Sequence, residues 1–202
     1  MLSRSAIVFL LGTALSVAGC DKGSPANGQA EANTAATISD EVSPDEAAPS
    51  AAGAATQAGA VDRSHKGEPA PDAAFATPDG KPATLASFRG KPLLLNLWAT
   101  WCAPCVKELP TLDAAAKALG GRVQVVAVSQ DMDAAKAKPF LAGKGFAAIV
   151  PYTDAKMALS LAYGANLPTT ILYDANGREI WRVAGDLDWT GAKAKALLAE
   201  AG

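Results

Sequence analysis

A short apolar run, Leu93–Leu97, is followed within a few residues by two closely spaced cysteines, Cys102 and Cys105. Only Asn96 interrupts the run, and a continuous apolar stretch of this length is typical of a strand that is covered on both faces. The residues from Ala103 onward favour a helix that ends at a pair of glycines after Leu119. The chain is therefore predicted to pass directly from a buried strand to a helix, with both cysteines at the start of that helix.

The segments around this unit alternate between strand-like and helix-like patterns. A hairpin is predicted within residues 71–84, around the turn signal Pro78-Asp79-Gly80. Further strands are predicted at 123–128, 147–152, 169–173 and 179–183, and helices at 133–144, 154–163 and 190–201. This order indicates an α/β domain over residues 67–202, with a central mixed β-sheet flanked by helices on both faces and an N-terminal β-hairpin extension.

The first residues have the layout of an export signal. Arg4 precedes an apolar run, small residues follow, and the run is too short to cross a bilayer as a helix. We therefore interpret residues 1–19 as a signal peptide. The sequence Leu15–Cys20 resembles a bacterial lipobox, which implies that Cys20 carries lipid and anchors the protein on the periplasmic side of the inner membrane. Asp21 resembles an inner-membrane retention signal.

Residues 20–66 differ sharply in composition from the rest of the chain. Small residues, prolines and acidic residues dominate, and such a segment cannot bury enough apolar area to offset the entropy of ordering it. We predict a disordered tether, with a weak helix as the alternative for its alanine-rich part. His65, the only histidine of the chain, falls at the edge of this tether.

The charge pattern argues against nucleic acid as a partner. The 18 basic residues are interspersed among 20 acidic ones, with a net charge of −2, whereas a nucleic-acid site needs clustered Lys and Arg. We expect a monomer without a cofactor. A metal site is also not expected, because the domain offers a single pair of cysteines.

Three interpretations compete for Cys102 and Cys105. A structural zinc site needs four protein ligands, and a catalytic one needs three, which this domain does not supply from cysteine and histidine. A purely structural disulfide is compatible with export, but closing so short a loop removes little chain entropy. The third interpretation is a redox couple, in which the amides at a helix start favour the thiolate of Cys102 and lower its pKa. Cys102 would attack a substrate disulfide and Cys105 would resolve the mixed disulfide.

The residues around the pair resemble a known family. Trp101–Cys105 matches the WCxPC motif of thioredoxins, and the flanking Leu95–Thr100 and Glu108–Pro110 resemble the membrane-anchored TlpA/ResA branch. The resemblance extends over residues 69–201. Its second landmark is Gly164–Thr170, which implies a thioredoxin fold with a cis peptide bond before Pro168, beside the sulfurs.

The resemblance also implies roles for residues near the sulfurs. Trp101 would shield them and present an aromatic face to partners, with simple core packing as the alternative. Glu108 is associated with activity in the resembled branch, and its spacing returns it to the helix face of Cys105. The alternative is a solvated surface glutamate. Asn96 stands where ordinary thioredoxins carry a buried acid, whose proton transfer an amide cannot perform.

The implied function is a thiol:disulfide oxidoreductase that reduces disulfides of extracytoplasmic proteins, such as apocytochrome c or related thiol targets. Its electrons would come from a membrane protein of the DsbD or CcdA kind. Two alternatives stay open. One is a thiol peroxidase on the same fold, for which Thr100 is the relevant neighbour, and the other is a copper metallochaperone without enzyme activity. The direction of disulfide exchange is not fixed by the sequence.

Overall fold

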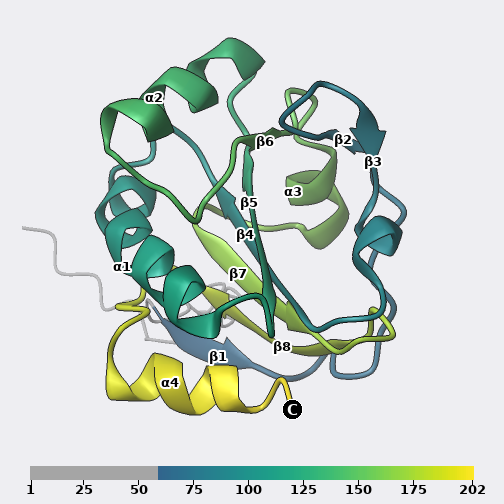
Figure 1. Cartoon of the computed structure of the whole chain (residues 1–202). Helices are drawn as coiled ribbons and strands as arrows, with labels where there is room; N and C mark the ends of the chain where they lie inside the picture. The colour runs from purple at the N-terminus through teal and green to yellow at the C-terminus, as the bar shows by residue number, and fades with distance from the viewer. Residues whose placement is uncertain (1–58) are drawn as a thin grey trace, which may run out of the picture. The chain divides into compact units, whose positions relative to one another are not determined.

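The computed structural model describes residues 59–202. In it, the apolar run Leu93–Trp98 forms β4, which lies in the middle of an eight-stranded sheet. The sheet order is β1-β8-β7-β4-β5-β6-β2-β3 (Figure 1). The other strands are β1 (Ala60–Asp62), β2 (Phe75–Ala76), β3 (Pro82–Ala83), β5 (Gln124–Ser129), β6 (Tyr152–Thr153), β7 (Thr169–Tyr173) and β8 (Glu179–Ala184). β4 pairs in parallel with β5 and antiparallel with β7, so the sheet is mixed as predicted.

Side chains of β4 alternate between two separate apolar clusters, because successive side chains of a strand point to opposite faces of the sheet. Leu94 and Trp98 pack with α1 (Ala103–Leu119), α2 (Ala137–Gly143) and α4 (Ala192–Ala199). Leu95 and Leu97 pack on the other face, with α3 (Ala158–Tyr163) and the 3-10 turn η1 (Leu85–Phe88). Figure 1 shows α1 and α3 on opposite sides of the sheet. The predicted fold class is confirmed.

The helix α1 begins and ends where the sequence predicts. Pro104 lies in its first turn, where the missing N–H of proline leaves no helical hydrogen bond unmade. Gly120 closes the helix with φ 57°, a left-handed conformation that glycine adopts without steric cost. Pro110 lies inside the helix.

Two predicted elements start later than expected, and at both places an aspartate side chain accepts hydrogen bonds from backbone amides. Oδ1 of Asp113 accepts hydrogen bonds from the amides of residues 147–149, so these residues do not pair with a neighbouring strand, and β6 is limited to Tyr152–Thr153. The carboxylate of Asp154 accepts from the amides of Ala158 and Leu159 and thereby caps α3. The helix expected from 154 begins at 158.

The helix predicted at 133–144 is divided in two. Residues 134–136 form a 3-10 turn, η2, which Asp133 caps by accepting from the amide of Ala135, and α2 follows directly. Pro139 lies in the first turn of α2, where its missing N–H breaks no helical bond. The hairpin predicted within 71–84 is confirmed as β2 and β3.

The boundary at residue 67 is wrong. β1, Ala60–Asp62, falls within the range assigned to the tether but pairs antiparallel with β8, from Ala60 opposite Ala184 to Asp62 opposite Arg182. A three-residue edge strand with one large apolar side chain has almost no sequence pattern, and it is held by backbone pairing. The predicted signal peptide, Cys20 and the tether before Gly59 lie outside the described residues. Within 59–202, none of the helices combines the length and the hydropathy that crossing a membrane requires.

Candidate active site

The cysteine pair lies where three loops meet at one edge of the sheet. The first loop, Ala99–Cys102, follows β4, and the second, Gln130–Met132, follows the parallel neighbour β5. β7 runs antiparallel to β4 with Thr169 opposite Leu97, so the loop that precedes β7 reaches the same edge. The register of these three strands therefore brings together segments up to seventy residues apart.

Cys102 and Cys105 form a disulfide at the start of α1. Cys102 is the N-cap residue of the helix, and its Sγ accepts a hydrogen bond from the amide of Cys105 at 3.3 Å. Cys102 retains 5% of its exposure, whereas Cys105 is fully buried. A partner can thus reach only the first sulfur, and the free amides and the positive end of the helix dipole face that sulfur.

The peptide bond between Leu167 and Pro168 is cis, as the resemblance implies. Pro168 directly precedes β7, and its carbonyl accepts a hydrogen bond from the amide of Gly185 at 2.9 Å. This bond ties the loop to the end of β8. The cis geometry predicted for Pro168 is confirmed.

A buried carboxylate that the sequence analysis missed fixes the loop in front of the disulfide. Asp131 accepts from the amide of Thr100 at 3.1 Å, from the Thr100 hydroxyl at 2.7 Å and from the Ser129 hydroxyl at 2.6 Å. It therefore ties the loop after β5 to the loop after β4. The hydroxyl of Thr100 is directed to this carboxylate. An aspartate two residues after the end of a buried strand was the available sequence signal.

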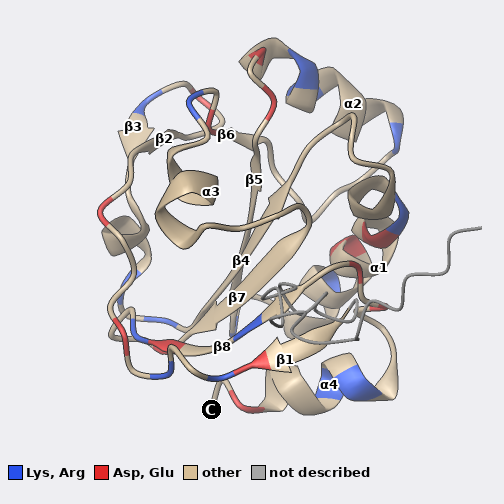
Figure 2. Cartoon of the chain, turned by 180° about the vertical axis from the view of Figure 1, so that it is seen from behind, with Lys and Arg blue, Asp and Glu red and all other residues tan. Residues whose placement is uncertain are grey.

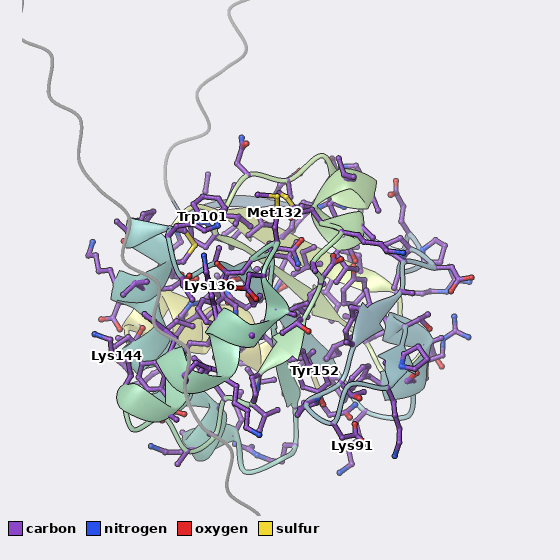
Figure 3. All side chains as sticks on the ribbon, turned by 90° about the horizontal axis from the view of Figure 1, so that it is seen from above. Lys91, Trp101, Met132, Lys136, Lys144 and Tyr152 are labelled. Atoms are coloured by element: carbon purple, nitrogen blue, oxygen red, sulfur yellow. A yellow bond between two sulfur atoms is a disulfide. The ribbon has the colours of Figure 1, made fainter. Side chains whose placement is uncertain are left out.

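Two large apolar side chains lie exposed on the face that carries the disulfide. Trp101 is 65% exposed and Met132 is 83% exposed. Figure 3 shows both on this face, with the disulfide next to Trp101. Core packing, the alternative role for Trp101, is therefore wrong. An exposed apolar pair beside the disulfide is accessible to another molecule.

Glu108 is almost fully buried one turn after Cys105, so the alternative of a solvated surface glutamate is wrong. Its Oε1 accepts from Nδ2 of Asn96 at 2.8 Å. Its Oε2 accepts from the amide of Leu187 at 3.1 Å and from the indole Nε1 of Trp189 at 3.3 Å. No cation pairs with this carboxyl group among residues 59–202.

Burial raises the pKa of Glu108 to about 7, because the charged form loses its hydration. The hydrogen bonds from Asn96, Leu187 and Trp189 act in the opposite direction, since they stabilise the carboxylate. The buried side chain therefore changes protonation state close to neutral pH. A carboxyl group of this kind can hold or accept a proton beside a thiol pair.

Sequence reasoning singled out Asn96 but not Trp189, and the structure joins both to Glu108. The amide of Asn96 cannot transfer a proton, but it donates a hydrogen bond that orients the carboxyl group of Glu108, which can. The same amide also donates to Oγ1 of Thr170 at 2.9 Å. Trp189 is buried, and its indole donates to Glu108. Hydropathy indicates that a tryptophan is buried, whereas the partner of its N–H depends on tertiary packing.

Histidine, cysteine and acidic side chains do not gather in threes within residues 59–202, so this part of the chain offers no cluster that could hold a metal ion. His65 instead pairs through Nδ1 with Oε2 of Glu68 at 2.9 Å, near the surface.

The sequence profile of the Redoxin family matches residues 65–198. Thiol-disulfide oxidoreductase ResA of Bacillus thuringiensis subsp. konkukian is 32% identical over 130 residues, which cover 59% of this chain and 70% of that protein. Thiol:disulfide interchange protein DsbE of Vibrio cholerae is 36% identical over 112 residues, which cover 54% of this chain and 58% of that protein. The thioredoxin-like protein YneN of Bacillus subtilis is 41% identical over 64 residues, and the chain spans only 38% of its length.

Solved structures agree with this assignment. The exposed lipoprotein thioredoxin Etrx1 of Streptococcus pneumoniae superimposes with a TM-score of 0.55 at 26% identity. The superposition covers 64% of this chain and 99% of that one. The cysteine pair at the helix start, the cis-proline loop and the sequence relatives lead to one assignment: the chain belongs to the Redoxin family and is a thiol-disulfide oxidoreductase of the ResA/DsbE kind.

Proposed function

We propose that this domain reduces disulfides of extracytoplasmic proteins, with apocytochrome c or related thiol proteins as the substrate class. The observation that carries the proposal is the asymmetry of the two sulfurs. Sγ of Cys102 caps α1 and Cys102 is 5% exposed, whereas Cys105 is fully buried. The first sulfur is suited to attack, and the second is suited to displace a captured partner.

The proposed exchange starts from the reduced pair. The thiolate of Cys102 attacks one sulfur of a substrate disulfide, which forms a mixed disulfide and releases the other substrate sulfur as a thiolate. The thiol of Cys105 then loses its proton and attacks Sγ of Cys102. The second substrate sulfur leaves, both substrate sulfurs take up protons, and the Cys102–Cys105 disulfide is formed. The domain gives the substrate two electrons; of the two protons that the substrate takes up, one balances the proton lost by Cys105 and the other comes from solvent, because Cys102 starts as the thiolate.

Glu108 is the proposed acceptor for the proton of Cys105. The carboxyl lies on the same face of α1 one turn further, it is buried, and its pKa of about 7 lets it exchange a proton near neutral pH. Asn96 and Trp189 position it. Trp101 lies next to the disulfide (Figure 3), the Pro168 loop reaches the same edge of the sheet, and we assign both to contact with the substrate chain.

The oxidised pair must be reduced again after each cycle. We propose a membrane electron donor of the DsbD or CcdA kind, which would attack the same exposed sulfur. We also propose that lipid on Cys20 holds the protein on the periplasmic side of the inner membrane. Membrane fractionation of a Cys20→Ser variant tests this anchor: the variant should become soluble, and its retention in the membrane would contradict the proposal.

Trapping of the mixed disulfide tests the exchange mechanism. Cys105→Ser, made in the reduced full-length protein, should accumulate covalent adducts with periplasmic proteins, detected on non-reducing gels and identified by mass spectrometry. Cys102→Ser is the matched control and should trap none, because the remaining thiol is buried. Absence of adducts with Cys105→Ser would contradict the mechanism. Peroxide consumption without a disulfide substrate, or Cu(I) binding without reductase activity, would support the alternatives.

The reduction potential of the Cys102–Cys105 pair tests the proposed direction of disulfide exchange. A potential below roughly −220 mV, in the range of glutaredoxins and thioredoxin, identifies a reductant. A value near −120 mV, like that of DsbA, identifies an oxidant and would overturn the proposed direction. The potential is measured by equilibration with glutathione or dithiothreitol and mass spectrometry of alkylated thiols.

A further inference from the structure

The loop between β8 and α4, residues 185–191, contacts the buried carboxyl group of Glu108. Its backbone amide at Leu187 donates to Oε2 of Glu108 at 3.1 Å, and the indole Nε1 of Trp189 donates to the same oxygen at 3.3 Å. The third donor to this carboxyl group is Asn96 of β4. The β8–α4 loop thus supplies two of the three hydrogen bonds that orient the carboxyl group.

Hydrogen bonds to two other parts of the site hold this loop in place. The amide of Gly185 donates to the carbonyl of Pro168 at 2.9 Å, which joins the start of the loop to the cis-proline loop. The amide of Trp189 donates to Oγ1 of Thr111 at 3.1 Å, which joins the loop to α1. The position of the two donors to the carboxyl group therefore depends on how the loop is held against α1.

An ion pair joins the same loop to α1 beside the carboxyl group. Nζ of Lys107 lies 2.8 Å from Oδ2 of Asp186. Lys107 directly precedes Glu108 in α1, and Asp186 directly precedes the amide donor Leu187 in the loop. The ion pair and the hydrogen bond from the loop thus join consecutive residues of the same two segments. Figure 2 shows the basic and acidic residues of α1 in blue and red.

The two charges of this ion pair have opposite effects on Glu108. The negative charge of Asp186 raises the pKa of Glu108, because it disfavours a second negative charge nearby. The hydrogen bond from Lys107 lowers the pKa of Asp186, so the aspartate is ionised at neutral pH. The positive charge of Lys107 offsets part of the negative charge beside the carboxyl group.

The remaining groups around Glu108 do not supply such a charge. Its three donors are uncharged N–H groups: a side-chain amide of β4, and a backbone amide and an indole of the loop. Asp188, the other acid of the loop, is exposed and accepts from the amide and the hydroxyl of Thr190. Further along α1, Asp113 pairs with Lys117 at 2.6 Å. The ion pair between α1 and the loop is therefore the charged contact that acts on the carboxyl group.

We propose that Lys107 and Asp186 are positioning residues for Glu108, which hold the β8–α4 loop on α1 and balance the negative charge beside the buried carboxyl group. Asp186 makes Glu108 a stronger base, and Lys107 limits this effect. The consequence for disulfide exchange rests on the proposed function, in which Glu108 accepts the proton of Cys105. The ion pair then sets the pH at which Glu108 is ionised and can accept that proton.

Carbon-13 NMR of the Glu108 carboxyl group in the oxidised full-length protein tests the proposal. Asp186→Asn keeps the shape of the side chain and removes its charge, so the midpoint of the Glu108 titration should fall. Lys107→Met keeps most of the aliphatic stem and leaves the charge of Asp186 uncompensated, so the midpoint should rise. Each shift should be roughly 0.3–0.7 pH units, on the order expected for an exposed ion pair.

The opposite signs separate a charge effect from a purely structural role. If the ion pair only held the loop, either substitution would loosen the hydrogen bonds from Leu187 and Trp189, and both midpoints would rise. Shifts of the same sign, or the absence of a shift in one of the two variants, would overturn the proposal. The double variant Lys107→Met/Asp186→Asn should titrate close to the wild type.

Lys117→Met is the matched control, because it breaks another ion pair of the same helix and should leave the Glu108 midpoint unchanged. The pH profile of kcat/KM for the disulfides of insulin separates this proposal from the proposed function. If Glu108 accepts the proton of Cys105, the profile should move with the NMR midpoint in each variant. A profile that stays in place while the midpoints move would contradict the proton-acceptor role, whereas the effect of the ion pair on Glu108 would stand.

Discussion

Nδ2 of Asn96 lies 2.8 Å from Oε1 of Glu108, and both side chains are buried. The first residue belongs to β4 and the second to α1, so this hydrogen bond joins the strand before the disulfide to the helix after it. The same amide nitrogen donates to Thr170 on β7, directly after the cis-proline loop. One amide therefore connects the three elements that build the site, and it orients the carboxyl that titrates there.

The raised pKa of Glu108 predicts a loss of stability as the pH rises. Burial moves this pKa from 4.5 to about 7, so the folded protein binds the proton more tightly than the unfolded chain. The contribution of Glu108 to the free energy of unfolding is fully present below about pH 4.5 and is lost as the pH rises through about 7. Its size is about 3 kcal/mol, from 1.36 kcal/mol for each pKa unit. Urea unfolding of the oxidised protein between pH 4.5 and pH 8 measures it.

Glu108→Gln is the control for this effect, because it keeps the shape of the side chain and removes the titration. The variant should show a nearly flat unfolding free energy between pH 5 and pH 8. The carboxyl groups of Asp113 and Asp186 have lowered pKa values and do not titrate in this range. An equally steep decline in the variant would show that another group is responsible.

Asn96→Ala should raise the pKa of Glu108 above about 7. The hydrogen bond from Asn96 is the largest of the effects that hold this pKa down, and burial stays in place when it is removed. The midpoint of the pH-dependent stability loss should move upward by about one unit, on the order expected for one lost hydrogen bond to a charged group. Thr170→Val removes the other partner of the same amide and should leave the midpoint where it is.

Asp131→Ala should destabilise the oxidised protein by about 2–4 kcal/mol, because it leaves the amide and hydroxyl of Thr100 and the hydroxyl of Ser129 without their acceptor. Asp133→Ala removes an exposed cap two residues away and should cost only about 1 kcal/mol. Denaturant midpoints of the two variants give the comparison. Equal costs would mean that Asp131 does not fix the loop.

Trp101→Ala should separate substrate contact from stability. Because the side chain is 65% exposed, its loss should change the unfolding free energy by no more than about 0.5 kcal/mol. The kcat/KM for a protein disulfide should fall about fivefold or more, whereas that for oxidised glutathione should hardly change, because only a protein can cover the exposed ring. Truncation of the fully buried Trp98 provides the contrast and should cost about 3–5 kcal/mol of stability. Equal losses on both substrates would contradict a contact role.

The sequence by itself determined the elements whose signals are local. The apolar run of β4, the cysteine that caps α1 and the glycine that ends it act within a few residues, so their pattern is sufficient. The same holds for the cis-proline, where the motif around Pro168 implied the peptide geometry that the structure contains.

Tertiary structure alone decided the relationships between distant residues. Asp113 uses the amides of residues 147–149 and prevents a strand there, and β1 exists only because β8 offers an edge to pair with. The burial of Glu108 and the exposure of Trp101 likewise depend on what packs against each side of α1. Such contacts join residues far apart in the chain, and hydropathy or spacing cannot specify them. The free energy of each contact depends on both residues together, whereas a sequence pattern describes only residues near one another in the chain.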